Sequence, residues 1–275
     1  MARAGRSEGG GAFGVVVTGL PAQADISYHR GSYIHRAGIT LAGIIAALLL
    51  TAQAANAACR QALALGLDIS GSVDTREYDL QRQGLAQALG TDDVARAILQ
   101  QSSAPIRLTV FEWSGPTAQT VILPWTTIAN ADDLTAARQR IRAAPRSIQD
   151  QTTALGSALL TGFAMLDTQA DCWTRTLDLS GDGIANTGPR PQDIPASRTP
   201  QGVTVNGLTI APNQQPGQDD SIADITELSA YFRAYVIRGP GAFVETALGF
   251  DNYAAAMERK LLRELQSLAL SDARQ

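Results

Sequence analysis

The stretch LALGLDISGS, residues 63–72, passes from a run of apolar side chains into an aspartate and two serines. A short and almost continuous apolar run is typical of a strand buried on both faces of a parallel sheet. The turn after it carries Asp68, Ser70 and Ser72, which are small oxygen donors at alternate positions. A turn that aims these oxygens at one point would suit a hard cation.

The residues around this stretch follow the strand-then-helix order of α/β proteins. A capping box, Asp74 to Glu77, begins a helix that is expected to end near Leu99. Gly115-Pro116 separates two strands that are expected to pair antiparallel. The expected strands are 61–67, 106–114, 117–125, 173–180, 203–210 and 234–237, and further helices are expected at 132–143, 153–166, 224–232 and 252–268. This order predicts a doubly wound, mostly parallel sheet with one antiparallel edge strand and helices on both faces.

Two polar turns are expected at the same edge of this sheet. Asp68 follows the first strand, and Asp182, in the sequence SGDG, follows the strand that begins near Trp173. In open α/β sheets, ligands bind beyond the carboxyl ends of the strands. We therefore expect the two aspartates to face one binding site.

The two cysteines test this layout. Cys59 lies nine residues before Asp68, and Cys172 lies ten residues before Asp182. If the two strands are parallel neighbours, about 4.8 Å apart, the thiols lie side by side at the opposite edge, within the roughly 4.4 to 6.8 Å that a disulfide spans between α carbons. A Cys59–Cys172 bridge is expected, with two unpaired thiols as the alternative.

The first 57 residues are interpreted as a signal peptide with a long amino-terminal region. An uncharged run at 39–58 ends in Ala55-Asn56-Ala57, the small-x-small form of a signal-peptidase site, and predicts cleavage after Ala57. An uncleaved membrane anchor is the alternative, because the run approaches spanning length. Residues 58–275 would then form a single periplasmic or secreted domain, with no membrane contact beyond the leader.

Composition excludes several classes of function. The net charge is −4 and lysine occurs once, at Lys260, which argues against nucleic-acid binding. Both histidines, His29 and His35, precede the predicted cleavage site. The mature chain would therefore lack Ser-His-Asp and Cys-His catalysis and histidine metal ligands.

Three segments together resemble the metal-ion-dependent adhesion site, or MIDAS, of von Willebrand factor A (vWA) domains. The D-x-S-x-S motif is Asp68 to Ser72, the threonine of the second loop is Thr153 in TALGSAL, and the third segment supplies Asp182. Thr152 leaves the choice of threonine open, and Gly181 stands where the family usually has a threonine before the aspartate. The segments CRQALALGLDISGSVD, VFEWSGP, LPWT, LDLSGDG, GVTVNGL and RGPGAFVE resemble more closely a bacterial branch of that superfamily, a family of unknown function, over nearly all of the chain from Cys59.

This resemblance implies a Rossmann-like vWA fold and a site for Mg²⁺, with Mn²⁺ or Ca²⁺ as other possible ions. Ser70, Ser72 and Thr153 would ligate the metal, and Asp68 and Asp182 would act directly or through water. The open coordination position would take a carboxylate from a partner protein. The alternative is a degenerate site, in which these residues only cap helices.

Three functions are compatible with the sequence. The first is a non-enzymatic, exported binding module that recognises an acidic group through Mg²⁺. The second is a metal-independent structural component of an envelope complex. The third is an Asp68-dependent, Mg²⁺-assisted phosphohydrolase, which lacks a second aspartate at Ser70 and would need Lys260 near the site. No catalytic residue is assigned, because neither a general base nor an activated nucleophile is identifiable.

Overall fold

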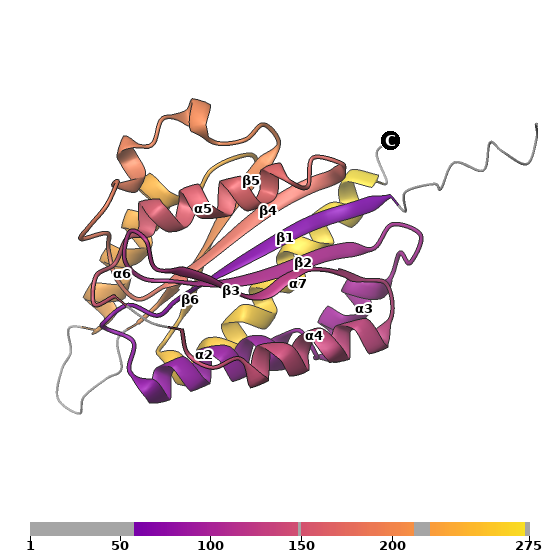
Figure 1. Cartoon of the computed structure of the whole chain (residues 1–275), viewed down its shortest axis with the longest axis horizontal. Helices are drawn as coiled ribbons and strands as arrows, with labels where there is room; N and C mark the ends of the chain where they lie inside the picture. The colour runs from indigo at the N-terminus through magenta and orange to yellow at the C-terminus, as the bar shows by residue number, and fades with distance from the viewer. Residues whose placement is uncertain (1–57, 148–149, 212–220, 273–275) are drawn as a thin grey trace, which may run out of the picture. The chain divides into compact units, whose positions relative to one another are not determined.

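A computed structural model describes residues 58–147, 150–211 and 221–272 (Figure 1). The predicted leader and its cleavage position after Ala57 lie outside these residues. The strands form one sheet in the order β3-β2-β1-β4-β5-β6, in which β3 runs antiparallel to β2 and the other neighbours are parallel. They are β1 (Cys59–Asp68), β2 (Ile106–Trp113), β3 (Gln119–Ile128), β4 (Cys172–Gly181), β5 (Val203–Ile210) and β6 (Val244–Ala247). The predicted sheet, with its antiparallel edge strand, is confirmed.

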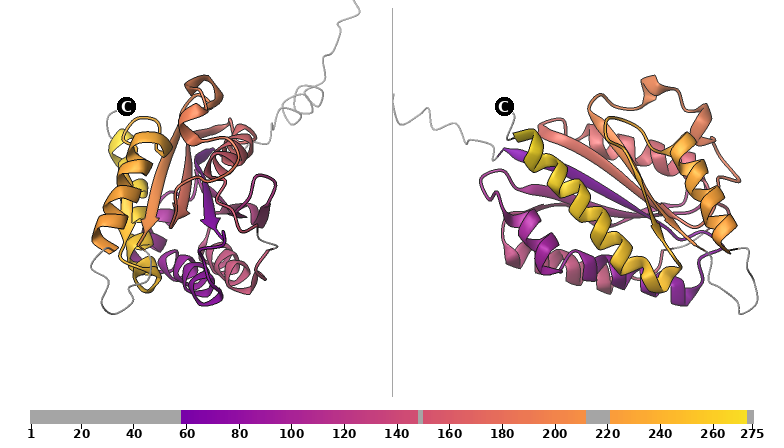
Figure 2. Two further views of the ribbon diagram at one scale, coloured as in Figure 1. Left: turned by 90° about the vertical axis from the view of Figure 1, so that its left-hand side faces the viewer. Right: turned by 180° about the vertical axis from the view of Figure 1, so that it is seen from behind.

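Helices cover both faces of the sheet (Figures 1 and 2). The helices on one face are α2 (Thr75–Ala88), α3 (Asp92–Leu99), α4 (Ala131–Ala143) and α7 (Tyr253–Asp272), and those on the other are α5 (Leu155–Asp167) and α6 (Ser221–Tyr231). Leu63, Leu65 and Leu67 point to the α2 and α7 face, and Ala62 and Ala64 to the α5 face. This burial on both faces explains the continuous apolar run. None of the helices in the described part of the chain is both long and apolar enough to cross a membrane.

The helix expected to run to Leu99 is two helices, α2 and α3. The chain turns at Gly90, whose N–H donates to the carbonyl of Gln87 at 2.9 Å. The guanidinium of Arg138 on α4 lies over Gly90 and donates to the carbonyl of Ala86 at 2.8 Å. A Cβ on Gly90 would lie 1.9 Å from the Arg138 Cζ. The Arg138 side chain thus packs α4 against the break, a contact that periodicity within one segment does not reveal.

The expected strand at 234–237 is wrong. Residues Phe232–Val236 form a single π-helical turn after α6, with Phe232 and Val236 both buried on the α5 face. The last strand is instead β6, which pairs parallel with β5. Phe232 and Val236 are four residues apart, which is a helical spacing. The expected strand covers only 234–237 and therefore does not include both of them.

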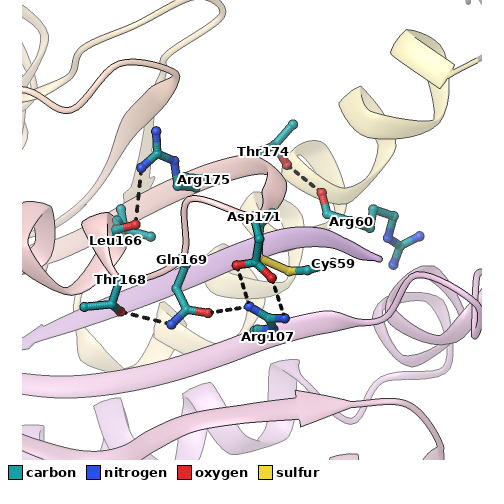
Figure 3. The surroundings of a disulfide bond; sticks show 10 residues. Cys59, Arg60, Arg107, Leu166, Thr168, Gln169, Asp171, Thr174 and Arg175 are labelled. Atoms are coloured by element: carbon teal, nitrogen blue, oxygen red, sulfur yellow. Dashed lines mark hydrogen bonds and ion pairs between the residues drawn. A yellow bond between two sulfur atoms is a disulfide. The ribbon is translucent and has the colours of Figure 1, made fainter. Parts of the chain in front are cut away.

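The Cys59–Cys172 disulfide is confirmed. The two residues are direct register partners of β1 and β4, with α carbons 4.4 Å apart. Beside it, Arg107 forms two hydrogen bonds of 2.9 and 2.8 Å to the carboxylate of Asp171 and a third, of 2.9 Å, to Gln169 (Figure 3). The amino-terminal edge of the sheet is thus held by a covalent bond and a neighbouring ion pair.

Candidate metal centre

Polar side chains from two turns meet at the carboxyl edge of β1 and β4. These strands are neighbours, with Leu67 opposite Ser180, so the turns that follow them lie together. The Ser72 hydroxyl donates to Asp182 Oδ1 at 2.7 Å, and the hydroxyl oxygens of Ser70 and Ser72 are 3.2 Å apart. Ser70 is fully buried, whereas Ser72 is exposed. The hydroxyl cluster therefore opens to solvent on the side of Ser72.

Asp68 lies at the buried end of this cluster. Its side chain is 0% exposed, and its Oδ1 accepts the Ser70 N–H at 2.8 Å. The amide of Gln81 donates to its backbone carbonyl at 2.8 Å. Its other oxygen, Oδ2, is buried and accepts no hydrogen bond from the described residues. A buried carboxylate with one unused oxygen is costly unless a proton or a cation compensates it.

Burial also raises the pKa values of the two aspartates at this edge of the sheet. Burial, and then the neighbouring charge of Asp182, raise the pKa of Asp68 to about 8, although hydrogen bonds from Ser70 act in the opposite direction. Burial also raises the pKa of Asp182, against the hydrogen bond from Ser72. Two carboxyl groups thus share a site that disfavours their full ionisation when no cation is bound.

Thr153 reaches the same edge from the loop before α5. Its N–H donates to Asn186 Oδ1 at 2.8 Å, and the Asn186 N–H donates to its carbonyl at 3.0 Å. These bonds pin the loop to the turn that follows Asp182. A Cβ on Gly183 would lie 3.9 Å from Thr153 Oγ1 and 4.0 Å from Thr153 Cγ2, so the end of this side chain lies near the turn.

The neighbouring Thr152 has a different role. Its hydroxyl and its N–H both donate to Asp150 Oδ1, at 2.8 and 2.9 Å. The Thr152 hydroxyl is therefore occupied in a local turn. Of the two threonines considered from the sequence, Thr153 is the one whose side chain lies near the Asp182 turn.

Two glycines allow these loops to approach closely. A Cβ on Gly71 would lie 2.5 Å from Gln151 Oε1 and 2.8 Å from the Gln151 carbonyl oxygen. A Cβ on Gly181 would lie 3.1 Å from Asp68 Oδ2. The extra glycine in SGDG, which departs from the family pattern, therefore leaves room for the unused oxygen of Asp68.

The residues that hold the loops of the site in place are not predicted from the sequence. Asn186 holds the Thr153 loop, Gln81 holds the backbone of Asp68, and the Ser114 carbonyl accepts the Ala154 N–H at 2.7 Å. Asn186 lies in the polar loop GIANTGPRPQ, whose Pro, Gly and Asn content indicates only a loop. Which of its side chains reaches Thr153 follows from tertiary structure.

The arrangement fits a small oxygen-ligated cation. Ligands of octahedral Mg²⁺ at about 2.05 Å lie roughly 2.9 Å from one another. The oxygen separations of 3.2 Å between Ser70 and Ser72 and 2.7 Å between Ser72 and Asp182 lie on either side of that value. No group of three or more His, Cys, Asp or Glu side chains suited to a metal occurs in the described ranges. A cation here would therefore be held largely by hydroxyls, which favours a hard ion over a soft one.

Lys260 lies elsewhere. It is fully buried in α7, where it is ion-paired with Asp178 and, at 2.5 Å, with Glu264. Asp178 is in register with Leu65, inside the sheet and not at its edge. These ion pairs hold the Lys260 ammonium beside Asp178 and Glu264 and not at the Asp68 turn.

Comparison with solved structures shows the fold at low sequence identity. The pilus adhesin SpaC from Lactobacillus rhamnosus GG is 14% identical, with a TM-score of 0.52 over 76% of this chain and 30% of that chain. Proximal thread matrix protein 1 from the mussel byssus is 15% identical, with a TM-score of 0.50 over 76% of this chain and 47% of that chain. A von Willebrand factor type A protein from Catenulispora acidiphila is 14% identical, with a TM-score of 0.47 over 75% of this chain and 42% of that chain. The chain spans less than half the length of these proteins.

The family assignment rests on sequence. No functionally curated protein is detectably similar to this chain. The model of one family, described as Protein of unknown function (DUF1194), matches residues 58–269, which is nearly the whole of the described domain. The chain therefore belongs to the DUF1194 family of proteins of unknown function.

Proposed function

We propose that this domain is an exported binding module that holds a divalent cation and uses it to recognise an acidic group on a protein partner. The observation that carries the proposal is the meeting of Ser70, Ser72 and Asp182 oxygens beside the unused Oδ2 of Asp68. Thr153 would complete the set from the second loop. Mg²⁺ is the proposed ion, because the donor set is made of oxygens and is rich in hydroxyls.

The chain's own residues would keep the bound ion attractive to an anion. Neutral hydroxyls from Ser70 and Ser72 compensate little of a dication's charge, and the ion would stay electrophilic where the Asp68 and Asp182 carboxylates act through water. The bound ion would supply a positive centre for a partner carboxylate. The exposed position of Ser72 leaves the cluster accessible from solvent.

Export is the second part of this proposal. Disulfides form and persist in oxidising compartments and are rare in the reducing cytosol of mesophiles. The Cys59–Cys172 bridge therefore supports a periplasmic or secreted location for the domain. The two alternative functions, a metal-independent structural role and phosphohydrolysis, have no specific observation in their favour.

The recognition step is tested by selecting peptides from a random display library in 5 mM MgCl₂. Enriched peptides are expected to contain Asp or Glu, to lose binding in EDTA, and to lose it again when the acidic residue becomes Asn or Gln. Ser72→Ala is expected to weaken binding about tenfold, because it removes one exposed oxygen ligand. Enrichment of peptides that bind equally well in EDTA would support the metal-independent structural role instead.

A second prediction concerns the glycine before Asp182. Gly181→Ala is expected to weaken Mg²⁺ or Mn²⁺ binding severalfold, because its Cβ would lie 3.1 Å from Asp68 Oδ2 and push that oxygen aside. Isothermal titration calorimetry measures the affinity. Gly183→Ala is the matched control, since its Cβ would meet only Thr153 atoms, at 3.9 Å or more. Equal losses in both variants would contradict the role assigned to Gly181.

A further inference from the structure

A row of polar side chains lines the amino-terminal halves of three neighbouring strands, on the face covered by α7. Gln61 of β1 lies opposite Thr174 of β4, and Thr176 of β4 lies opposite Thr204 of β5. One step further along, Asp178 lies opposite Asn206. Toward the carboxyl ends, the same face is mostly apolar and includes Leu65, Leu67 and Leu208, although the buried Ser180 also lies there and donates to Gln81. The polar half of this face is therefore localised, far from the candidate metal centre.

Buried charges form the floor of this region. Lys260 lies between Asp178 and Glu264, and Asn206 donates to Glu264 Oε1 at 2.7 Å. The pKa of Glu264 is raised well above its usual range, by burial first and then by the charge of Asp178. Buried ionic clusters contribute little net stability compared with an apolar core, so they are weakly explained by stability alone.

The polar side chains open into a cavity of about 370 Å³, which we call the α7 cavity. Its lining includes Gln61, Thr176, Asn206, Phe243, Arg263 and Glu264. This volume lies within the range of about 300–1,000 Å³ that is typical of small-molecule sites.

The segment RGPGAF, residues 238–243, forms one wall of the cavity and is held in place by β5. Arg238 and Val205 exchange backbone hydrogen bonds of 2.8 and 3.1 Å. Gly239 has φ of 89°, and a Cβ there would lie 2.9 Å from the Val203 carbonyl oxygen, so only glycine fits. The Phe243 N–H donates to Asn206 Oδ1 at 3.1 Å. The wall is therefore preformed.

Two side chains in the lining, Gln61 and Arg263, are suited to bind a ligand, one as a hydrogen-bond acceptor and the other as a cation. Gln61 is 1% exposed and donates from Nε2 to the Thr176 hydroxyl at 3.1 Å, but its Oε1 is buried and accepts no hydrogen bond from the described residues. The guanidinium of Arg263 stacks on the Phe243 ring, with Cζ 3.9 Å from the ring centroid. Among the side chains the structure describes, no carboxylate pairs with Arg263. The cavity thus offers a cation and a buried hydrogen-bond acceptor.

We propose that the α7 cavity binds a small carboxylate that also carries hydroxyl or ammonium donors. The carboxylate pairs with the planar fork of Arg263, which suits bidentate binding. The hydroxyl or ammonium group donates to Gln61 Oε1 and supplies the partner that this buried oxygen lacks. This site is independent of the candidate metal centre, which lies at the opposite ends of the same strands.

The test uses four defined probes in isothermal titration calorimetry, with the full chain in EDTA so that the metal centre has no part in the result. D-gluconate and L-serine carry both the carboxylate and the donors, acetate carries the carboxylate alone, and glycerol carries hydroxyls alone. At least one of the first two is expected to bind with a millimolar or lower Kd. Acetate and glycerol are expected to bind at least tenfold more weakly.

Variants locate the binding. Arg263→Ala and Gln61→Leu are each expected to weaken it at least tenfold, with Thr204→Val as a milder lining change. Arg259→Ala is the matched control. It removes the same charge one turn earlier on α7, where Arg259 pairs with Glu245, and it should bind as the wild type does. Circular dichroism confirms that each variant is folded. The proposal is overturned if neither gluconate nor serine binds at 10 mM, or if binding is equal in Arg263→Ala and Arg259→Ala.

Discussion

Replacing Asp68 with asparagine is expected to raise the melting temperature of the metal-free protein at pH 8 and to abolish its response to Mg²⁺. Burial raises the pKa of the Asp68 carboxyl from the ordinary value of 3.8 to about 8 in the folded chain. The folded state therefore binds this proton more tightly than the unfolded state. Between about pH 4 and pH 8, stability contributed by the neutral carboxyl is lost as pH rises.

Asparagine mimics the neutral carboxyl and does not ionise. Because one pKa unit corresponds to about 1.36 kcal/mol, the stability gained at pH 8 amounts to several kcal/mol at most. The same substitution removes one of the two carboxylates at the candidate metal centre. The variant should therefore be more stable than the wild type without metal, and unresponsive to it.

Thermal unfolding from pH 5 to pH 8.5, in EDTA and in 10 mM MgCl₂, measures both effects. In EDTA the wild-type melting temperature should fall toward pH 8, and Mg²⁺ at a hundred times its Kd should restore about 2.7 kcal/mol. Asp74→Asn, which keeps an N-cap side chain for α2, is the charge-matched control and should respond as the wild type does. A melting temperature for Asp68→Asn below that of the wild type at pH 8 in EDTA would contradict the prediction.

Much of this site was predictable because its signals are local. The apolar run before Asp68 identifies a strand buried on both faces, and the turn after it necessarily lies at the edge of the sheet. The same reasoning places Asp182 after β4, and the strand lengths then align Cys59 with Cys172. When two parallel strands are regular, counting residues back from the turns that follow them gives the register of the pair.

The parts that escaped prediction depend on contacts between distant segments. Asp150 accepts the hydroxyl of Thr152, a local contact that distinguishes it from Thr153 and that the sequence does not reveal. The break at Gly90 is packed against Arg138, which comes from α4. No periodicity within one segment carries this information.

The α7 cavity illustrates the same limit on a larger scale. Asp178, Asn206 and Lys260 each look like isolated polar residues in the sequence, where Lys260 enters only as the single lysine of the chain and the lysine that a phosphohydrolase would need. The register between β4 and β5 brings the first two together, and the packing of α7 adds the third. Polar residues inside a predicted strand are thus informative once neighbouring strands are known.

Removing the disulfide is expected to destabilise the protein strongly while leaving its metal affinity unchanged. Cys59 and Cys172 are 113 residues apart in sequence, and a bridge closing a loop of about 100 residues is worth roughly 4.7 kcal/mol through the entropy of the unfolded chain. Native bridges typically contribute about 2–5 kcal/mol. For a domain of this size, at about 2–4 °C per kcal/mol, Cys59→Ala/Cys172→Ala should melt roughly 10 °C lower.

The metal centre should be insensitive to this change because of its position. Nine residues of strand separate Cys59 from Asp68, a distance of roughly 30 Å at about 3.3 Å per residue. The Arg107–Asp171 ion pair also remains beside the vacated bridge to hold β2 near β4. Wild-type protein that is unfolded, reduced and refolded in dithiothreitol should reproduce the lower melting temperature. A double variant that melts as the wild type does but binds Mg²⁺ more weakly would show that the bridge acts on the site and not on the unfolded chain.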